Sequence, residues 1–242
     1  FGNPEKPEVF WQFVNCIKGM SEAASKLGTP VVSGNVSLYN ETRGGEAVLP
    51  TPTVGMVGLL DDVEHRLDMG FKAAGDTLIL LGHLRDDIAG SEYLSMIHGL
   101  ETGACPAIDL DEEKKLIDFI LDMNQKGFIK SCHDISEGGL AVCIGESAIS
   151  GKVGVTVDLG NAPGRADGLL FGEAPTRVVI SVDSSNSEPV LNAAQAVQLA
   201  AAVIGKVGGD TLKISANGQQ KVDIPVSELE AKWQGAIRCT MS

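Results

Sequence analysis

Apolar residues recur at helical spacing near the start of the chain. Pro7 is placed to open a helix, and Gly28 is placed to end it. A period of 3.6 residues puts every third or fourth position on one side, so the pattern predicts an amphipathic helix whose aromatic residues face a core. The positions on that face are Val9, Phe10, Phe13, Val14, Ile17, Met20, Ala23 and Ala24.

The pattern then changes to the alternation of apolar and polar residues that is typical of strands. Residues 31–42 ("VVSGNVSLYNET") predict a strand that is interrupted by three small residues, Ser33-Gly34-Asn35. A second strand is predicted over Val48 to Leu60 ("VLPTPTVGMVGLL"). Two prolines near its entry indicate an edge strand or a bulge.

Beyond this point strand and helix patterns alternate along the chain. A polar stretch from Asp61 to Asp68 marks the expected domain boundary, and Asn217-Gly218 predicts a type I′ hairpin. The mixture of hairpins and alternating elements favours α/β or α+β layers with a mixed sheet. The predicted strands are 76–81, 128–132, 153–157 and 177–182, and the predicted helices are 111–126, 136–149 (capped by Ser136), 189–201 and 227–237.

Composition indicates a folded protein that does not bind nucleic acid through charge. The chain has 242 residues, of which 43% are hydrophobic and 21% charged, so a packed core is expected. Its formal net charge of -13 would repel a phosphate backbone, which argues against a nucleic-acid partner. An acidic nucleotide would need metal ions and backbone amides to bind.

Five widely spaced cysteines, without a Cys-x-x-Cys pair, indicate isolated reduced thiols and a cytoplasmic location. The longest apolar run, around Leu78 to Leu81, is too short to cross a bilayer, and no signal peptide is visible, so no membrane partner is expected. The opening residues Phe1-Gly2-Asn3-Pro4 are typical of a loop, and we expect the sequence to be part of a longer chain. The cysteines are Cys16, Cys105, Cys132, Cys143 and Cys239.

The first candidate site is the stretch Ser33 to Ser37. Gly34 would let a ligand approach the backbone closely, because no Cβ blocks it. Asn35 offers a neutral oxygen suited to Mg²⁺, and Ser37 would face the same side as Asn35 in an extended strand. Ser, Gly and Asn are also the common residues of ordinary turns, so pattern alone leaves a purely structural turn as the alternative.

The second candidate site is "HDISEGGLA", residues 133–141. A short strand would deliver His133 and Asp134 at its end, with Gly138-Gly139 in the first turn of the next helix. First-turn amides and the helix dipole favour an anion, and an adjacent Asp could hold the metal that accompanies phosphate. The alternatives are a tight turn that needs small residues and a histidine at the rim of a core.

The third candidate site is "LLFGEAPTRVVISV", where Glu173 stands just before a strand and Arg177 is within reach of it. The alternative is an exposed ion pair that contributes little energy. The preceding glycine-rich stretch, Gly160 to Gly172, is the part of the chain that we expect to be mobile. The sequence shows no Ser-His-Asp trio and no His-x-x-x-His pair.

Five strings, in this order along the chain, resemble the synthetase subunit of phosphoribosylformylglycinamidine synthases. The resemblance covers essentially the whole chain. The chain is similar to the small-subunit form, which works with a separate glutamine amidotransferase subunit and a small accessory subunit. The strings are "FGNPEKPEVFWQFV", "GTPVVSGNVSLYNET", "PTPTVGMVGLL", "HDISEGGLA" and "LFGEAPTRVVIS".

The resemblance implies an α/β fold of the aminoimidazole ribonucleotide synthetase type with mixed sheets. The family's subunit holds two tandem copies of a two-domain unit. Residues 1–60 would be the remainder of the second copy's N-terminal domain, and residues 61–242 its C-terminal domain. The family's catalytic histidines and main Mg²⁺-binding acids belong to the first copy, the missing N-terminal half of the subunit. No catalytic residue is therefore expected here, and the fragment alone should be inactive.

The resemblance also implies roles for individual residues. Gly34 would contact ATP, Asn35 would contact Mg²⁺, and Ser37 would contact formylglycinamide ribonucleotide. By pseudo-symmetry with the first copy, a second group would form an auxiliary nucleotide site without turnover. That group is Asp134, Gly138, Gly139 and Glu173.

The implied activity is that of a purine-biosynthesis ligase. It would convert formylglycinamide ribonucleotide and glutamine-derived ammonia to the amidine, with release of ADP and phosphate. The alternative function is a non-catalytic scaffold half that binds a structural nucleotide and docks partner subunits.

Overall fold

The computed structural model describes residues 1–241, with side chains described up to residue 237. The chain divides into two compact units, Phe1–Asp61 and Asp62–Ser242. The helices are α1 (Pro7–Leu27), α2 (Glu92–His98), α3 (Leu110–Gln125), α4 (Gly139–Gly151), α5 (Ala166–Phe171), α6 (Ser187–Ala196) and α7 (Val226–Met241), with short 3₁₀ turns η1 (Val63–His65) and η2 (Ser184–Asn186). The strands are β1 (Thr77–Leu81), β2 (Ile129–Asp134), β3 (Val155–Asp158), β4 (Val178–Val182), β5 (Ala201–Val207), β6 (Thr211–Ala216) and β7 (Gln219–Pro225).

Helix α1 of the first unit confirms the predicted bounds, because Pro7 starts it and Gly28 caps its end. Its predicted core-facing side is confirmed only in part. Val9 is buried, but Phe10 is 55% exposed. Phe13 is half-buried and meets the ring of Phe1 edge-on, with the ring centroids 5.3 Å apart. The helix therefore presents an apolar face that this unit covers only in part.

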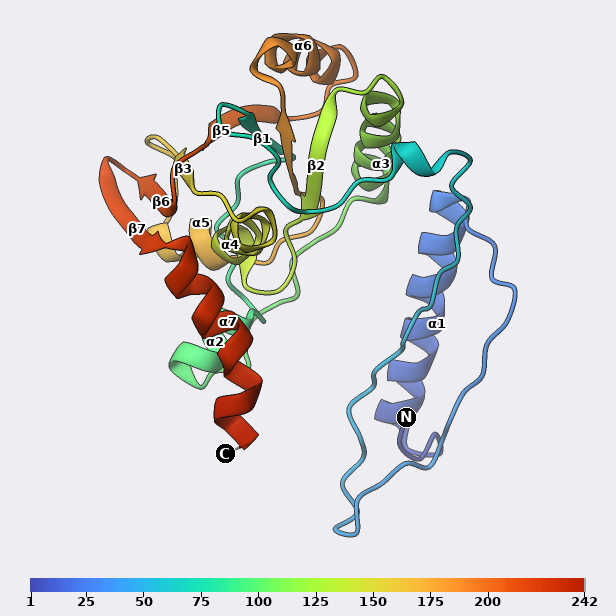
Figure 1. Cartoon of the computed structure of the whole chain (residues 1–242). Coiled ribbons are helices and arrows are strands. Elements are labelled where there is room, and N and C mark those ends of the chain that lie inside the picture. Colours follow the sequence, from blue (N-terminus) through green and yellow to red (C-terminus); the bar gives the residue numbers. More distant parts are fainter. Residues whose placement is uncertain (242) are drawn as a thin grey trace. The chain divides into compact units, whose positions relative to one another are not determined.

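The two strands predicted for the first unit are absent from the described residues. Residues 29–61 contain one isolated bridge, between Glu41 and Ala47, and otherwise run as the long loop drawn in Figure 1. Val32 is 91% exposed and Leu59 is 93% exposed. A strand is stabilised by pairing with a neighbour along its length, and the described part of this unit supplies only the pairing around that one bridge. Apolar alternation alone therefore did not produce a sheet.

The second unit is built on one seven-stranded sheet, with the order β2-β4-β1-β5-β3-β6-β7 (Figure 1). The neighbours β3 and β6 are parallel, and the other pairs are antiparallel. This confirms the predicted α/β class with a mixed sheet. Asn217 and Gly218 both have positive φ, 53° and 69°, in the turn between β6 and β7, which confirms the hairpin signal.

Helices cover both faces of the sheet around its central strand β1. All five residues of β1 are buried. Leu78 and Leu80 join a cluster that includes residues of α4 and α5, whereas Ile79 and Leu81 join a cluster that includes residues of α3 and α6. Because successive side chains of a strand point to opposite faces, β1 contributes to both cores. The loops at the ends of β2 and β4 are thereby held in fixed positions.

Several elements differ from the prediction. Helix α6 ends at Ala196, and the residues expected to continue it lead into β5, which the pattern did not indicate. The glycine-rich stretch expected to be mobile instead contains α5, whose Leu169 is fully buried. Gly168 lies so close to Asp86 that a Cβ would stand 2.5 Å from its carbonyl oxygen. The glycines of this stretch therefore allow close packing.

Candidate functional site

The stretch Ser33 to Ser37 lies in the first unit and is exposed throughout. A Cβ built on Gly34 would meet no atom within 4 Å, so the backbone here is open to an approaching group. Because the predicted strand is absent, Asn35 and Ser37 do not share a strand face. The stretch offers accessible polar groups on an irregular backbone.

Ser37 is tied into a local turn with Asn40. The Asn40 Nδ2 donates to Ser37 Oγ at 2.8 Å, and the Ser37 hydroxyl lies 3.2 Å from Asn40 Oδ1. The same Nδ2 lies 3.2 Å from the carbonyl oxygen of Phe1. These bonds orient the Ser37 hydroxyl, which is consistent with the structural turn and with a substrate contact alike.

The chain supplies part of a metal site at most. Asn35 offers one neutral oxygen, a suitable but weak ligand for Mg²⁺. Across the described residues there is no group of three His, Cys, Asp or Glu side chains placed to hold a metal ion. A Mg²⁺ ion at Asn35 would therefore need its remaining ligands from nucleotide phosphates or from other polypeptide.

In the second candidate site, β2 runs to Asp134, two residues beyond the predicted strand 128–132, and its His133 faces helix α4. The His133 Nδ1 lies 3.1 Å from the carbonyl oxygen of Cys143 and 3.2 Å from Ser147 Oγ. Its Nε2 lies 3.6 Å from a carboxylate oxygen of Glu146. These contacts agree with a rim histidine that anchors the strand to the helix. Asp134 is exposed at the strand end.

The turn Gly138-Gly139 of the second candidate site is joined to Glu173 of the third, a contact that the sequence analysis did not predict. Glu173 Oε1 accepts the N–H of Gly138 at 2.7 Å and the N–H of Glu92 at 2.9 Å. The predicted Ser136 cap is wrong: the N-cap residue of α4 is Gly138, in the left-handed region with φ 80°. The Ser136 carbonyl instead accepts the N–H of Gly139 at 3.0 Å.

Arg177 does not form the exposed ion pair that was the alternative for this site. It is 2% exposed, and its guanidinium points inward. Its Nε donates to Ala174 O at 2.9 Å, and its Nη2 donates to Gly172 O at 2.7 Å, so it holds the two carbonyls that flank Glu173. Burial, and then the nearby Arg85, lower the pKa of Arg177 to about 10. The guanidinium therefore holds the loop in place and does not form a surface ion pair.

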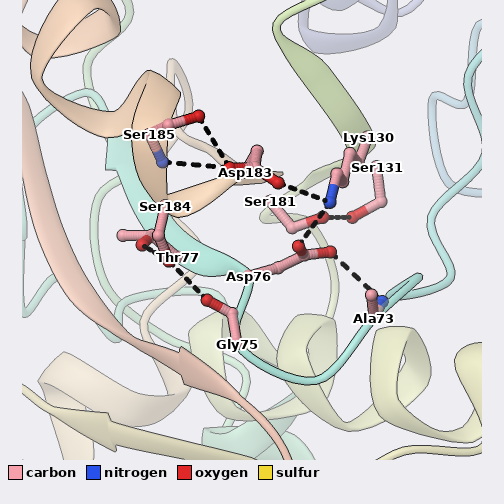
Figure 2. A network of polar contacts seen from close by, with 10 residues as sticks. All are labelled: Ala73, Gly75, Asp76, Thr77, Lys130, Ser131, Ser181, Asp183, Ser184 and Ser185. Carbon is pink, nitrogen blue, oxygen red and sulfur yellow. Dashed lines mark hydrogen bonds and ion pairs between the residues drawn. The ribbon is translucent and has the colours of Figure 1, made fainter.

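A polar network that the sequence analysis missed lies at the opposite ends of the same strands (Figure 2). Asp76 is 3% exposed and accepts from Lys130 Nζ at 2.6 Å and from Ala73 N at 3.1 Å. Lys130 also contacts Asp183 at 3.4 Å. These residues meet because β1 and β2 both begin beside the end of β4. The three residues are spread over more than a hundred positions of the sequence, so their spacing gave no sign that they meet.

A pair of hydroxyls and a hydroxyl-to-carbonyl bond extend this network. Ser131 Oγ and Ser181 Oγ lie 2.6 Å apart on the paired strands β2 and β4, and both residues are buried. Ser184 Oγ donates to Gly75 O at 2.5 Å. The acids and hydroxyls here satisfy one another and the backbone, so the network stabilises the sheet end and does not form an open site.

The cysteines do not form a reactive site in the part of the chain whose side chains are described. Cys16, Cys105, Cys132 and Cys143 are free thiols. Burial raises the pKa of the Cys132 thiol to about 11 and raises that of Cys143 further. Cys239 lies outside the described side chains. None of the helices that the structure describes is long and apolar enough to span a bilayer.

Two family models match the sequence of this chain. The model of the AIR synthase related protein, C-terminal domain, matches residues 73–216, and that of the AIR synthase related protein, N-terminal domain, matches residues 1–60. The first match covers strands β1 to β6, helices α2 to α6 and the loops that carry Asp134 and Glu173. The second match covers the segment that carries Gly34, Asn35 and Ser37.

Curated relatives match over the full length of the chain. The phosphoribosylformylglycinamidine synthase subunit PurL of Thermoanaerobacter pseudethanolicus is 46% identical over 241 residues, which are 100% of this chain and 33% of that protein. The subunit of the same name from Moorella thermoacetica is 44% identical over 242 residues, again 100% of this chain and 33% of that protein. The chain thus spans about a third of the length of these relatives.

Solved structures share the fold. Thermotoga maritima PurL complexed with FGAR has a TM-score of 0.62 at 20% identity, over 69% of this chain and 30% of that one. The same protein complexed with ATP has a TM-score of 0.57 at 18% identity, over 69% and 28%. The sheet, the two helical layers and the family-model matches lead to one conclusion: this chain belongs to the AIR synthase related protein family.

Proposed function

We propose that the chain is part of a phosphoribosylformylglycinamidine synthase, an ATP-dependent ligase of purine biosynthesis. The observation that carries the proposal is the match to PurL subunits over the whole chain, at 44–46% identity. The related Thermotoga maritima protein is described in complex with FGAR, ATP, ADP and AMPPCP, which supports a nucleotide and this substrate for the present chain. The proposed location is the cytoplasm.

The proposed reaction forms a C–N bond at the cost of ATP. The amide oxygen of formylglycinamide ribonucleotide takes the γ-phosphoryl group of ATP, with release of ADP. Ammonia then attacks the activated amide carbon, and phosphate leaves to give the amidine. Mg²⁺ bound to the phosphates would supply the charge neutralisation that a chain of net charge -13 cannot provide.

The proposed contributions of this chain come from the exposed stretch 33–37. Gly34 would leave room for the nucleotide, since a side chain there would project into open space. Asn35 would donate a neutral oxygen to Mg²⁺, and Ser37, oriented by Asn40, would contact the ribonucleotide. We further propose that residues 1–60 are the remainder of a second N-terminal domain, and residues 61–242 its C-terminal domain. The catalytic residues would then lie in other parts of the full subunit.

The test uses the full-length subunit. Asn35→Ala should lower ammonia-dependent synthetase activity about tenfold or more at limiting Mg²⁺, with partial recovery at high Mg²⁺, because one ligand is lost. The matched control is Asn192→Ala, an exposed asparagine on α6, which should leave activity unchanged. Equal activity of the Asn35 variant and the control at limiting Mg²⁺ would refute the role of Asn35.

A second candidate function is a scaffold half that binds a structural nucleotide at Asp134, Gly138, Gly139 and Glu173. One observation favours a link between these residues, which is the bond from Gly138 N–H to Glu173. The same bond means that a phosphate at this turn would have to displace the Glu173 carboxylate. Calorimetry with ADP and Mg²⁺ tests this function, and no measurable heat would contradict it.

Docking of the amidotransferase and accessory subunits is likewise a proposal, supported by the described PurLQS structure from Thermotoga maritima.

A further inference from the structure

Glu173 touches two segments that are far apart in sequence. Its carboxylate accepts the N–H of Gly138, at the start of α4, and the N–H of Glu92, the first residue of α2. One oxygen, Oε1, takes both bonds, at 2.7 and 2.9 Å. Hydrogen bonds to an ionised acceptor are roughly twice as strong as neutral ones. The side chain therefore joins two helix starts through a charged acceptor.

Helix α2, on one side of this junction, is weakly packed. We call residues 85–98, which carry α2, the strap. Helix α2 contains no buried residue, and its Met96 and Ile97 are 76% and 66% exposed. With so little apolar burial, the hydrophobic effect contributes little to docking of the helix. Polar and ring contacts must supply the rest.

Further contacts of the strap reach the same loop and helix α5. Asp87 O accepts the N–H of Glu173 at 3.2 Å, and the Tyr93 ring stacks on that of Phe171 with centroids 5.1 Å apart. Tyr93 OH lies 3.5 Å from Asp167, at the limit of a hydrogen bond. The loop itself is rigid, because the buried Arg177 holds the carbonyls on both sides of Glu173.

We propose that Glu173 is a positioning residue that latches the strap onto the Gly138-Gly139 turn. Loss of its carboxylate releases the strap and frees the Gly138 amide, while the sheet stays folded. The inference concerns the folded chain alone and does not depend on the proposed synthase activity. An experiment that refutes the latch therefore leaves the proposed synthase activity standing, and the reverse also holds.

Hydrogen exchange on the full chain tests the latch. In Glu173→Ala the amides of residues 92–98 and of Gly138 should exchange about tenfold faster or more, because a charge-assisted bond is lost. The amides of β1 should keep their wild-type rates. The matched control is Glu137→Gln, which removes the charge of an exposed neighbour and should change neither region.

A conservative variant separates positioning from general destabilisation. Glu173→Gln keeps an acceptor oxygen and should accelerate exchange of residues 92–98 less than Glu173→Ala, in the order Ala, Gln, wild type. If the Ala variant does not fold, the Gln variant alone should still show faster exchange confined to the strap and Gly138. Thermolysin should also cut near Met96 and Ile97 faster in these variants. Unchanged exchange in the strap, or an equal increase in β1, would overturn the proposal.

Discussion

The two units of the chain carry similar apolar patterns and bury them differently. In Phe1–Asp61, α1 and the alternating residues 31–60 leave side chains such as Val32 and Val57 exposed. In Asp62–Ser242, apolar runs become paired strands, and every residue of β1 and of β4 is buried, Ile180 among them. The second unit has seven strands that pair with one another, whereas the described residues of the first contain one isolated bridge.

This difference teaches that apolar alternation specifies a face to be covered but does not supply the cover. A strand needs a paired neighbour and a packed face, and both come from residues distant in sequence. In the second unit those residues lie within the chain. For the first unit, we propose that its exposed segments pair with other parts of a longer subunit, of the kind that the relatives have.

The sharpest way to break this comparison is to truncate one apolar side chain in each unit. Ile180→Ala should lower the free energy of unfolding by about 2–5 kcal/mol, because it opens a cavity in a closed core. Val57→Ala should change that free energy by less than about 0.5 kcal/mol, since its side chain contacts solvent. Urea unfolding followed by circular dichroism measures both. A large cost for Val57→Ala would show that residues 48–60 are packed in solution.

Glycine substitutions give the next largest difference. Gly139 has φ 71°, and a Cβ there would lie 2.7 Å from the backbone of Phe171, so Gly139→Ala should cost about 2–4 kcal/mol. Gly34 has open space around it, so Gly34→Ala should leave the unfolding free energy nearly unchanged. The thermal midpoints of the two variants measure the contrast. Equal shifts would mean that Gly34 is packed against a neighbour.

Much of the second unit could be predicted from the sequence. Strands β1 and β4, helices α3 and α7 and the Asn217-Gly218 hairpin follow from periodicity and local turn chemistry, which act within a few residues. Strand β5 was missed because it follows an alanine-rich helix pattern without a strong breaker. The order of the strands could not be predicted, since pairing joins residues that are distant in sequence.

The candidate sites were predictable as loops but not as contacts. Gly138-Gly139 and Glu173 were both singled out, and the bond between them depends on how α4 packs against α5. The Ser136 cap failed because Glu173, thirty-five residues beyond Gly138, satisfies the first free amide instead. The inward orientation of the Arg177 side chain and the Asp76–Lys130 ion pair depend on burial, which the spacing of residues in the sequence does not indicate.

Lys130 offers a smaller effect that belongs to the second unit alone. Lys130→Met should cost about 1.5–3 kcal/mol, because the buried Asp76 loses its charged partner. The hydrogen bond with Asp76 raises the pKa of Lys130 above its value in the unfolded chain. Its stabilising contribution is therefore complete below the unfolded pKa and is lost as pH rises through the folded pKa. Thermal midpoints should therefore fall more steeply in the wild type than in Lys130→Met as the pH rises above 10.5, the value for the unfolded chain.

The smallest effect concerns the first unit's own tertiary ion pair. Lys6 Nζ lies 2.7 Å from Glu41 Oε1, thirty-five residues away. Its hydrogen bond lowers the pKa of Glu41, so the carboxylate should titrate at lower pH in the wild type than in Lys6→Met. The contribution of the pair to stability is present above the unfolded pKa of Glu41 and is lost as pH falls through the folded pKa. A pH titration of the Glu41 carboxyl by nuclear magnetic resonance measures the shift, with Glu5→Gln as a control for net charge. An identical titration in Lys6→Met would show that the hairpin of residues 40–48 is not held against the start of α1. The first unit would then have even less tertiary structure of its own than the comparison assigns to it.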